Sequence, residues 1–402
     1  MPEAWIVATA RSPIGRAQKG SLVNVRPDDL GATVLKAVLA KVPGLDPNEV
    51  EDVIVGCAQP AGESGYNLGR VIGLLAGLKD VPGTTVNRYC ASSLQAIRMA
   101  AHAIKAGEGD VFVAAGIETV SRFGKGRADG MPDTKNPKLA DAEARSAARA
   151  LGGQGTWTPR DGLPDVYIAM GYTAENVAEK ENVTRAAMDE FAALSQTRAI
   201  AAQKAGMFAS EITPITLPDG SVFAQDECPR ASTIEKLAEL KPVFRPDGRV
   251  TAGNACPLND GAAAVVVMSD TRAKALGVKP MARIVASAVT ALDPEIMGLG
   301  PIEASRMALK RAHLSMNDID LVEINEAFAA QVLPSAHALG VPLDKLNVLG
   351  GAIALGHPFG MTGARIMATL LNALDRTGGR LGLETMCVGG GQGMAMIVEK
   401  LS

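Results

Sequence analysis

Cys90 stands where a short β-branched run gives way to a helical pattern. Thr84–Val86 predicts a strand, and apolar residues at helical spacing from Leu94 to Ile104 predict a helix that ends at Gly107. At the start of a helix, the unpaired amides and the positive end of the dipole favour a thiolate. Cys90 is therefore a candidate nucleophile. Free cysteine is also among the most buried residue types, so Cys90 could instead be a structural core residue. Catalytic partners elsewhere in the chain are needed to favour the role of a nucleophile.

His357 is the first such partner. It lies within the glycine-rich stretch 350–360, and the following Pro358 disfavours a helical backbone at the histidine. A histidine held in such a turn is well placed to take a proton from a thiol. A lone histidine is often only structural, but the glycines shift the interpretation toward function. The remaining histidines fall in helix-like stretches and are read as structural: His102, His313 and His337.

Two further residues stand at the ends of predicted strands. Cys387 follows the strand 383–386 and precedes the glycine-rich segment 388–393, which is either a plain hairpin turn or a source of amides for an oxyanion. Asn325 follows another strand directly, where its alternative role is that of a helix N-cap. Two cysteines, a histidine and an asparagine together suggest acyl transfer through a covalent thioester, with the second thiol moving a proton.

The composition describes a globular α/β protein. Of 402 residues, 47% are hydrophobic and only 3% aromatic, while 43 are glycine, so small and branched aliphatics must build a closely packed core. The net charge of −3 gives no electrostatic footprint for nucleic acid and no basic patch for a membrane surface. The longest apolar run, 262–268, is far too short for a membrane span, and the start of the sequence does not resemble a signal peptide. We therefore expect a cytoplasmic protein.

The five cysteines are scattered, with an odd count and no C-x-x-C pair. This pattern argues against a zinc site and against a disulfide framework, so we expect reduced thiols and no metal.

The first part of the chain alternates strand and helix patterns up to about residue 115. The expected strands are 4–8, 53–55, 84–86 and 111–115, and the expected helices are 28–39, 67–75 and 91–106. After Ser121 the composition shifts toward Gly, Pro and charged residues, and the segment 122–164 reads as an excursion with a helical patch at 140–150. Further helices are expected at 173–180 and 185–205, and a strand at 262–268.

The third part of the chain repeats a sequence pattern of the first part. Asn48–Val55 and Asn317–Ile324 share one pattern, an asparagine, alternating acids and aliphatics, then a strand, at an offset of 269 residues. Carried forward from Cys90, this offset leads to about position 359, beside His357, which also precedes a predicted helix. Two copies of one α/β unit can thus face each other across a pseudo-twofold axis. Coincidence between two ordinary βα units is the alternative.

With these residues in view, the sequence resembles the thiolase family over nearly its whole length. Four motifs occur together in family order: NRYCASSLQAI at Cys90, INEAFAAQ at Asn325, GGAIALGHPFGMTGAR at His357 and MCVGGGQGMA at Cys387. The resemblance implies an α/β fold of two similar βαβαβαββ halves in a five-layer αβαβα core with an inserted loop domain. Residues 1–120 plus 258–280 would form the N-terminal half, 121–257 the loop domain and 281–402 the C-terminal half.

The resemblance also implies the activity of a 3-ketoacyl-CoA thiolase, an acyltransferase that works by a ping-pong reaction. Cys90, helped by His357, would attack the 3-keto carbon, and Cys387 would protonate the departing acetyl-CoA enolate. Cys387 would then activate the CoA thiol that frees the shortened acyl-CoA. His357 and a water held by Asn325 would form one oxyanion hole, and the amides of Cys90 and Gly389 the other.

CoA is implied as a co-substrate, with no permanently bound cofactor, and a homodimer or homotetramer is expected. The residues expected to contact CoA are Arg230, Lys236, Leu240, Val243, Phe244, Ala252, Cys256, Met170 and Phe328. Lys241 and Arg245 are further candidates for its phosphates. Cys256, Lys236 and Leu349 depart from the residues usual in the family, and Leu349 could alter hydrogen bonding near His357.

Three other functions remain open from the sequence. A biosynthetic acetoacetyl-CoA thiolase is the close alternative, because the equilibrium runs both ways. A ketoacyl synthase would carry a different residue in place of Cys387. A non-catalytic CoA or lipid carrier would not need all four chemical residues.

Overall fold

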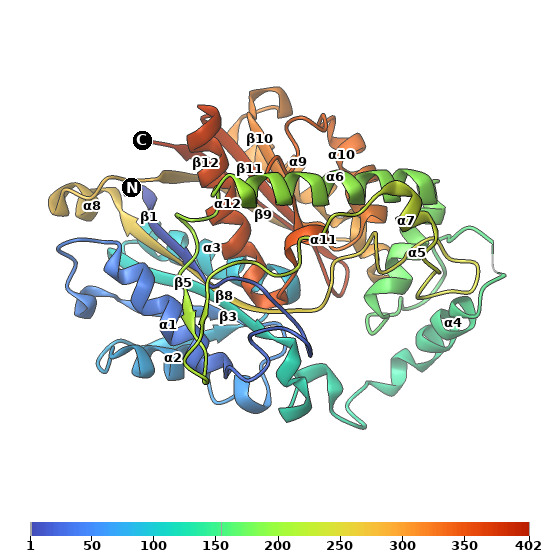
Figure 1. Ribbon diagram of the computed structural model, residues 1–402, viewed down its shortest axis with the longest axis horizontal. Helices are drawn as coiled ribbons and strands as arrows, with labels where there is room; N and C mark the ends of the chain where they lie inside the picture. Colours follow the sequence, from blue (N-terminus) through green and yellow to red (C-terminus); the bar gives the residue numbers. More distant parts are fainter. Residues whose placement is uncertain (1, 154, 402) are drawn as a thin grey trace.

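One long mixed sheet organises the molecule (Figure 1). The computed structural model describes residues 2–153 and 155–401. Within this part of the chain, the strand order is β10-β11-β12-β9-β1-β8-β5-β3-β4, with β2 beside β8. The strands of this sheet are β1 (Ala4–Arg11), β2 (Gly15–Arg16), β3 (Asp52–Gly56), β4 (Gly83–Val86), β5 (Val111–Thr119), β8 (Asn259–Ser269), β9 (Ala282–Ala291), β10 (Leu321–Ile324), β11 (Leu381–Val388) and β12 (Gln392–Lys400). A separate pair is formed by β6 (Ile215–Thr216) and β7 (Val222–Phe223).

The two ends of this sheet have the same internal order, which confirms the predicted repeat. In the first half β4 and β5 flank β3 in parallel, and β8 returns antiparallel to β5. In the second half β10 pairs in parallel with β11, and β12 returns antiparallel to β11. The two halves join where β1 meets β9 at Trp5 and Arg283. Strands β3 and β10, which carry the repeated sequence pattern, therefore occupy equivalent places.

The two halves of the sheet are the second and fourth layers of the expected five-layer fold, and the helices form the other three layers. They are α1 (Pro27–Ala40), α2 (Leu68–Ala76), α3 (Ser92–Ala106), α4 (Ala140–Ala150), α5 (Met170–Lys180), α6 (Arg185–Lys204), α7 (Ile234–Ala238), α8 (Asp270–Leu276), α9 (Gly300–Ala312), α10 (Ala329–Leu339), α11 (Ala352–Leu355) and α12 (Thr362–Thr377). Helices α1 and α2 cover the first half of the sheet, and α9 covers the second half and packs against α10. Helices α3 and α12 pack against each other as the central layer.

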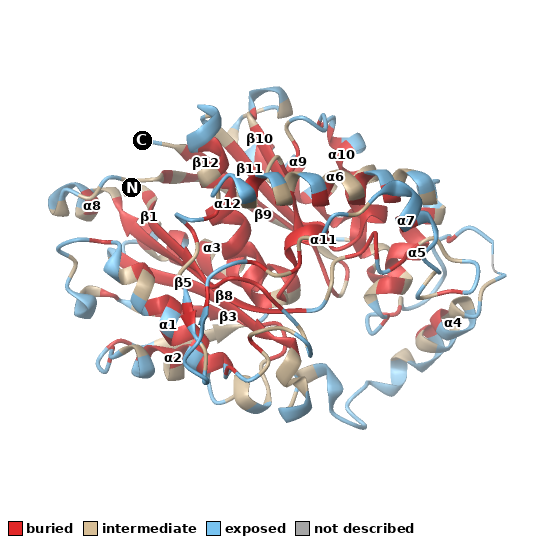
Figure 2. Ribbon diagram, viewed as in Figure 1, coloured by how far each residue is buried: buried red, intermediate tan, exposed pale blue. Residues whose placement is uncertain are grey.

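Glycine allows the two central helices to approach closely. A Cβ atom at Gly363 of α12 would lie 2.5 Å from the backbone nitrogen of Leu94 in α3. Beside this contact, the amide of Ala364 donates to the hydroxyl of Ser93 at 2.9 Å. Figure 2 shows that α3 and α12 are largely buried together with the strands. The junction of the two halves is thus a closely packed, buried layer.

The sequence patterns found most of the elements but not all of them. Strand β9 and helices α9 and α10 lay outside the predicted elements, and His313 was wrongly placed within a helix. It is instead the C-cap of α9, with a left-handed backbone at φ 55°. The exact domain boundaries stay a prediction. No helix in the described ranges is long and apolar enough to cross a membrane.

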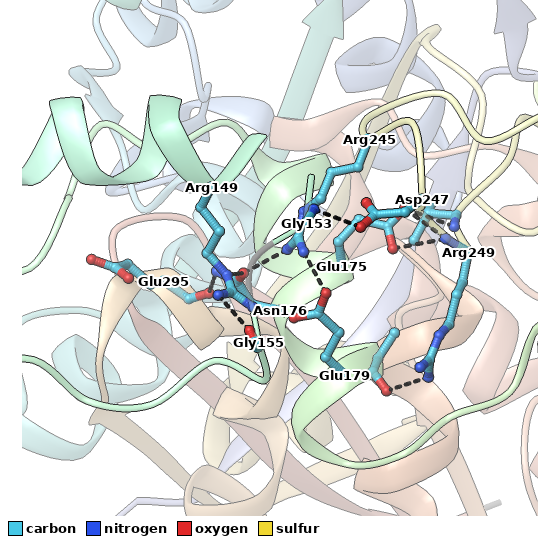
Figure 3. A network of polar contacts seen from close by, with 12 residues as sticks. Arg149, Gly153, Gly155, Glu175, Asn176, Glu179, Arg245, Asp247, Arg249 and Glu295 are labelled. Atoms are coloured by element: carbon cyan, nitrogen blue, oxygen red, sulfur yellow. Dashed lines mark hydrogen bonds and ion pairs between the residues drawn. The ribbon is translucent and has the colours of Figure 1, made fainter. Parts of the chain in front are cut away.

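The segment after β5 folds as short 3-10 turns followed by α4, and a polar network fastens it to α5 (Figure 3). Arg149 of α4 donates to the side-chain oxygen of Asn176 at 2.8 Å and pairs with Glu179. Arg245 donates to the same asparagine at 2.7 Å and pairs with the same glutamate at 2.5 Å. Two arginines from distant segments therefore meet on one face of α5, and they hold the inserted region together.

Candidate active site

Cys90 lies in a single 3-10 turn, Tyr89–Ala91, between β4 and α3. The turn begins with a left-handed backbone at Tyr89, φ 42°, a conformation that costs energy for a residue with a side chain. The hydroxyl of Ser92 supports this geometry because it accepts the amide of Arg88 at 2.9 Å and donates to the carbonyl of Tyr89 at 2.7 Å. The predicted junction of strand and helix is therefore present, with a tight turn at the sulfur.

The start of α3 does not by itself make Cys90 a thiolate. Burial raises the pKa of this thiol to about 12, and the amide of Gly389, which bonds the sulfur and favours the anion, offsets only part of the increase. The side chain is 8% exposed, so removal from water outweighs the field of the helix. Cys90 is therefore a thiol at neutral pH, and it needs a base before it can act as a nucleophile.

His357 lies just before the 3-10 turn Phe359–Met361 and α12, three residues ahead of the place in the second half that is equivalent to Cys90. Its ring is buried, with Nδ1 2.6 Å from the hydroxyl of Thr362 and Nε2 3.3 Å from the side-chain nitrogen of Asn325. Its backbone amide donates to Asn259 at 3.0 Å. Burial, assisted by the charge of Arg365, lowers the pKa of His357 to about 3. The imidazole is therefore neutral at pH 7, with one ring nitrogen free of a proton.

Asn325 follows β10 and is held by its backbone on both sides. Its amide donates to the carbonyl of Thr385 in β11 at 3.0 Å, and its own carbonyl accepts from Gln331 at 2.6 Å. The alternative role as a helix N-cap is wrong, because α10 begins at Ala329 and its N-cap is Phe328. Within the described chain, the buried Oδ1 of Asn325 has no hydrogen-bond partner, so it offers an acceptor to a bound ligand.

Cys387 lies at the end of β11, one residue before its last residue and opposite Gly393 of β12, close to where the sequence placed it. It is fully buried, and burial together with the neighbouring thiols of Cys90 and Cys256 raises its pKa well above the usual value. The glycines beyond it form the tight turn between β11 and β12, and the first of them, Gly389, presents its amide to the sulfur of Cys90. The segment is thus both a hairpin turn and an amide donor.

Packing brings these residues to one place. The turn that carries Cys90 contacts both β11, which carries Cys387, and the 3-10 turn Phe359–Met361 that follows His357. Asn325 joins them through its side-chain contact with His357. The turn that carries the thiol of the first half therefore packs against the elements of the second half that carry or follow the imidazole and the second thiol, and the amide contacts the imidazole.

Some of the residues expected to contact CoA contact the segment that follows Asn325. Phe244 packs edge-on against Phe328 at 6.1 Å, and the amide of Cys256 donates to the carbonyl of Ala327. Arg230 reaches the carbonyl of Ala252 at 3.4 Å. The side chains with exposed apolar surface are Leu240 and Val243, while Lys236 lies in α7 and Met170 opens α5. Their role in CoA binding stays a prediction.

The prediction that Arg245 contacts a CoA phosphate is wrong. Arg245 is 4% exposed and is committed to Asn176 and Glu179, so a phosphate group at the surface cannot reach it (Figure 3). Leu349 is not among the hydrogen-bond partners of His357 and packs instead against the hydrophobic core.

Three residues near the site were missed from the sequence. Thr362 bonds the histidine ring, Glu118 bonds the amide of Gly360 in the histidine turn at 3.0 Å, and Asp129 lies 3.5 Å from the hydroxyl of Tyr89. A hydroxyl five residues after a histidine and an acid at the end of a strand are common in proteins. These residues can be recognised as part of the site only from their position in the folded structure.

Comparison with known proteins gives the same family throughout. Residues 4–271 match the model of the thiolase N-terminal domain, and residues 278–400 match the thiolase C-terminal domain. A β-ketoadipyl-CoA thiolase of Acinetobacter baylyi is 46% identical, and a 3-ketoacyl-CoA thiolase of Aeromonas hydrophila is 44% identical, each over the full length of both chains. The crystal structure of the Bacillus anthracis acetyl-CoA acetyltransferase superposes with a TM-score of 0.87 at 42% identity, covering 100% of this chain and 99% of that one.

The fold and these matches define an α/β acyltransferase. The chain belongs to the thiolase family.

Proposed function

We propose that this protein is a 3-ketoacyl-CoA thiolase, which uses CoA to cleave a 3-ketoacyl-CoA into acetyl-CoA and a shortened acyl-CoA. The observation that carries the proposal is the meeting of a buried thiol, Cys90, with a neutral imidazole, His357, and a second buried thiol, Cys387. Cleavage of a carbon-carbon bond by a thiol needs a nucleophilic thiol, a base for its proton and an acid that protonates the enolate released, and these three groups can supply them.

In the proposed reaction, Nε2 of His357 takes the proton of Cys90 and the thiolate attacks the 3-keto carbon. The amides of Cys90 and Gly389 stabilise one oxyanion, and protonated His357 with a water on Asn325 stabilises the other. Cleavage of the carbon-carbon bond releases an enolate, which takes the proton of Cys387. Cys387 then removes the proton of an incoming CoA thiol, and that thiol displaces the acyl group from Cys90.

A biosynthetic acetoacetyl-CoA thiolase is the second candidate, because the solved acetyl-CoA acetyltransferase is similar over the whole chain. A dicarboxylic substrate is the third, because a β-ketoadipyl-CoA thiolase is 46% identical. We also expect a cytoplasmic homodimer or homotetramer. The half-exposed edge strand β4 offers a surface for such an assembly, and light scattering would give its mass.

The deciding experiment is a substrate series. Initial rates of CoA-dependent cleavage would be measured for 3-ketoacyl-CoAs of increasing length and for 3-ketoadipyl-CoA, beside condensation of acetyl-CoA. We expect cleavage of at least one neutral 3-ketoacyl-CoA to exceed condensation at equal concentration. Mass spectrometry should find the acyl group on the peptide that contains Cys90, and Cys90→Ser should abolish both the adduct and turnover. An acyl group trapped on another cysteine would disprove the assignment.

A further inference from the structure

The hydroxyl of Thr362 lies between the ring of His357 and a backbone carbonyl. Its oxygen is 2.6 Å from Nδ1 of His357 and 2.8 Å from the carbonyl oxygen of Pro358. The threonine is the first residue of α12 and is completely buried, and the histidine is 1% exposed. Solvent therefore does not compete for this hydroxyl, and its two neighbours decide the position of its proton.

The carbonyl of Pro358 fixes the direction of the hydrogen bonds. A carbonyl oxygen only accepts, and a hydroxyl has one proton, so the bond at 2.8 Å requires Thr362 to donate to Pro358. This bond to the carbonyl four residues earlier is common for threonine in the first turn of a helix. The hydroxyl can then only accept from the histidine, so Nδ1 of His357 carries the proton.

The other ring nitrogen agrees with this assignment. The side-chain nitrogen of Asn325 lies 3.3 Å from Nε2, and an amide NH₂ group only donates. A proton on Nε2 would set two donors against each other, whereas a bare Nε2 accepts the bond. The ring of a neutral histidine carries one proton, and the bond made by one nitrogen sets the state of the other.

We propose that Thr362 is a positioning residue that holds His357 as the Nδ1–H tautomer, which makes Nε2 the nitrogen that takes the proton of Cys90. The proposal rests on the proposed function. The S–H bond of Cys90 breaks as the N–H bond at Nε2 forms, and the Nδ1–H bond stays with Thr362 throughout. As Nε2 takes this proton, the side-chain NH₂ of Asn325 has to give up its hydrogen bond to Nε2, and the imidazolium can then donate its new Nε2–H to the substrate oxyanion. One nitrogen thus performs both steps, without rotation of the ring.

The first test replaces the hydroxyl and keeps the shape. Thr362→Val removes the acceptor from Nδ1, whereas Thr362→Ser keeps it. Thr369→Val is the matched control, because Thr369 is also a buried threonine of α12 and its hydroxyl donates to Glu211 at 3.1 Å, away from His357. Each variant would be assayed for kcat and KM, and its unfolding midpoint in urea would be measured.

We expect Thr362→Val to lower kcat about tenfold or more with little change in KM, the rate equivalent of one lost hydrogen bond of about 1.4 kcal/mol. Thr362→Ser should stay within about threefold of the natural enzyme. Thr369→Val should keep full kcat even where its unfolding midpoint falls as far as that of Thr362→Val. Full kcat in Thr362→Val, or an equal loss of kcat in Thr369→Val, would overturn the proposal.

The second test reads the tautomer directly. The chain has four histidines, so ¹⁵N spectra of the histidine-labelled protein, with His357→Asn for assignment, can resolve the ring of His357. We expect a protonated Nδ1 and a bare Nε2 in the natural enzyme at pH 7. A protonated Nε2 would overturn the proposal even if Thr362→Val did not fold. An enzyme inactive on every 3-ketoacyl-CoA would instead refute the proposed function, and this spectrum would still decide the tautomer.

Discussion

At the scale of single residues, the two buried thiols are suited to different tasks. Cys90 receives a hydrogen bond from the amide of Gly389, which favours its anion, whereas Cys387 lies fully buried inside β11. Burial raises the pKa of Cys387 well above its usual value, and the neighbouring thiols of Cys90 and Cys256 raise it further. Cys387 therefore keeps its proton until a stronger base, such as an enolate, appears.

Cys387→Ala tests this division of roles. The variant should still form the acyl-enzyme at Cys90 slowly, because the nucleophile and His357 remain. Turnover should fall by about 100-fold or more, since a positioned proton donor contributes about 10²–10⁴. Cys57→Ala is the control, because it removes another fully buried thiol that lies beside Glu118. Rapid-quench mass spectrometry and steady-state thiolysis give the two rates, and normal thiolysis in Cys387→Ala would contradict the role of this thiol.

At the scale of elements, the short 3-10 turn Ala128–Gly130 connects the inserted region by hydrogen bonds to residues near Cys90. Asp129 accepts from the side-chain nitrogen of Gln59 at 2.6 Å and donates its amide to the oxygen of the same side chain at 2.8 Å. Its other oxygen lies 3.5 Å from the hydroxyl of Tyr89, the residue before Cys90. The ring of Tyr89 also lies against Gly389, whose amide bonds the sulfur of Cys90. We therefore expect the acyl chain of a substrate bound at Cys90 to lie near Tyr89 and Asp129.

Asp129→Ala should loosen the turn without touching the chemical groups. We expect KM for a 3-ketoacyl-CoA to rise about fivefold with kcat within twofold, because the lost hydrogen bonds are partly exposed and contribute about 1 kcal/mol together. Hydrogen exchange of the amides in residues 125–133 should become faster. Asp161→Ala, an exposed aspartate of the same inserted region, should change neither quantity. An unchanged KM in Asp129→Ala would show that this turn does not border the substrate path.

At the scale of the whole molecule, the sequence was sufficient to predict the repeat and the meeting of the halves. The pattern shared by β3 and β10 and the position of His357 opposite Cys90 follow from periodicity and glycine placement, which are local properties. The thiol pKa was not predictable, because it depends on how completely the second half covers Cys90. The sequence also could not show that Arg245 is bonded to Glu179 and Asn176, because these residues lie 66 and 69 positions earlier in the chain.

The contact between the halves also contains a buried acid. Glu118 lies one residue before the end of β5 in the first half. It accepts the amide of Ala58 at 2.9 Å and the amide of Gly360, in the histidine turn of the second half, at 3.0 Å. One carboxylate oxygen therefore holds both backbone segments that surround the active site. Burial raises the pKa of Glu118 from 4.5 to about 7, despite these two donors.

This pKa makes the stability of the molecule depend on pH in a definite direction. Between pH 4.5 and about 7 the folded state holds a proton that the unfolded state has lost, so the free energy of unfolding falls as pH rises. In Glu118→Gln the amide oxygen can still accept both bonds, and this contribution disappears. The natural enzyme should therefore lose about 3 kcal/mol relative to Glu118→Gln between pH 4.5 and 7.5, as measured by urea unfolding. Parallel stability profiles would mean that Glu118 is not a buried titrating acid.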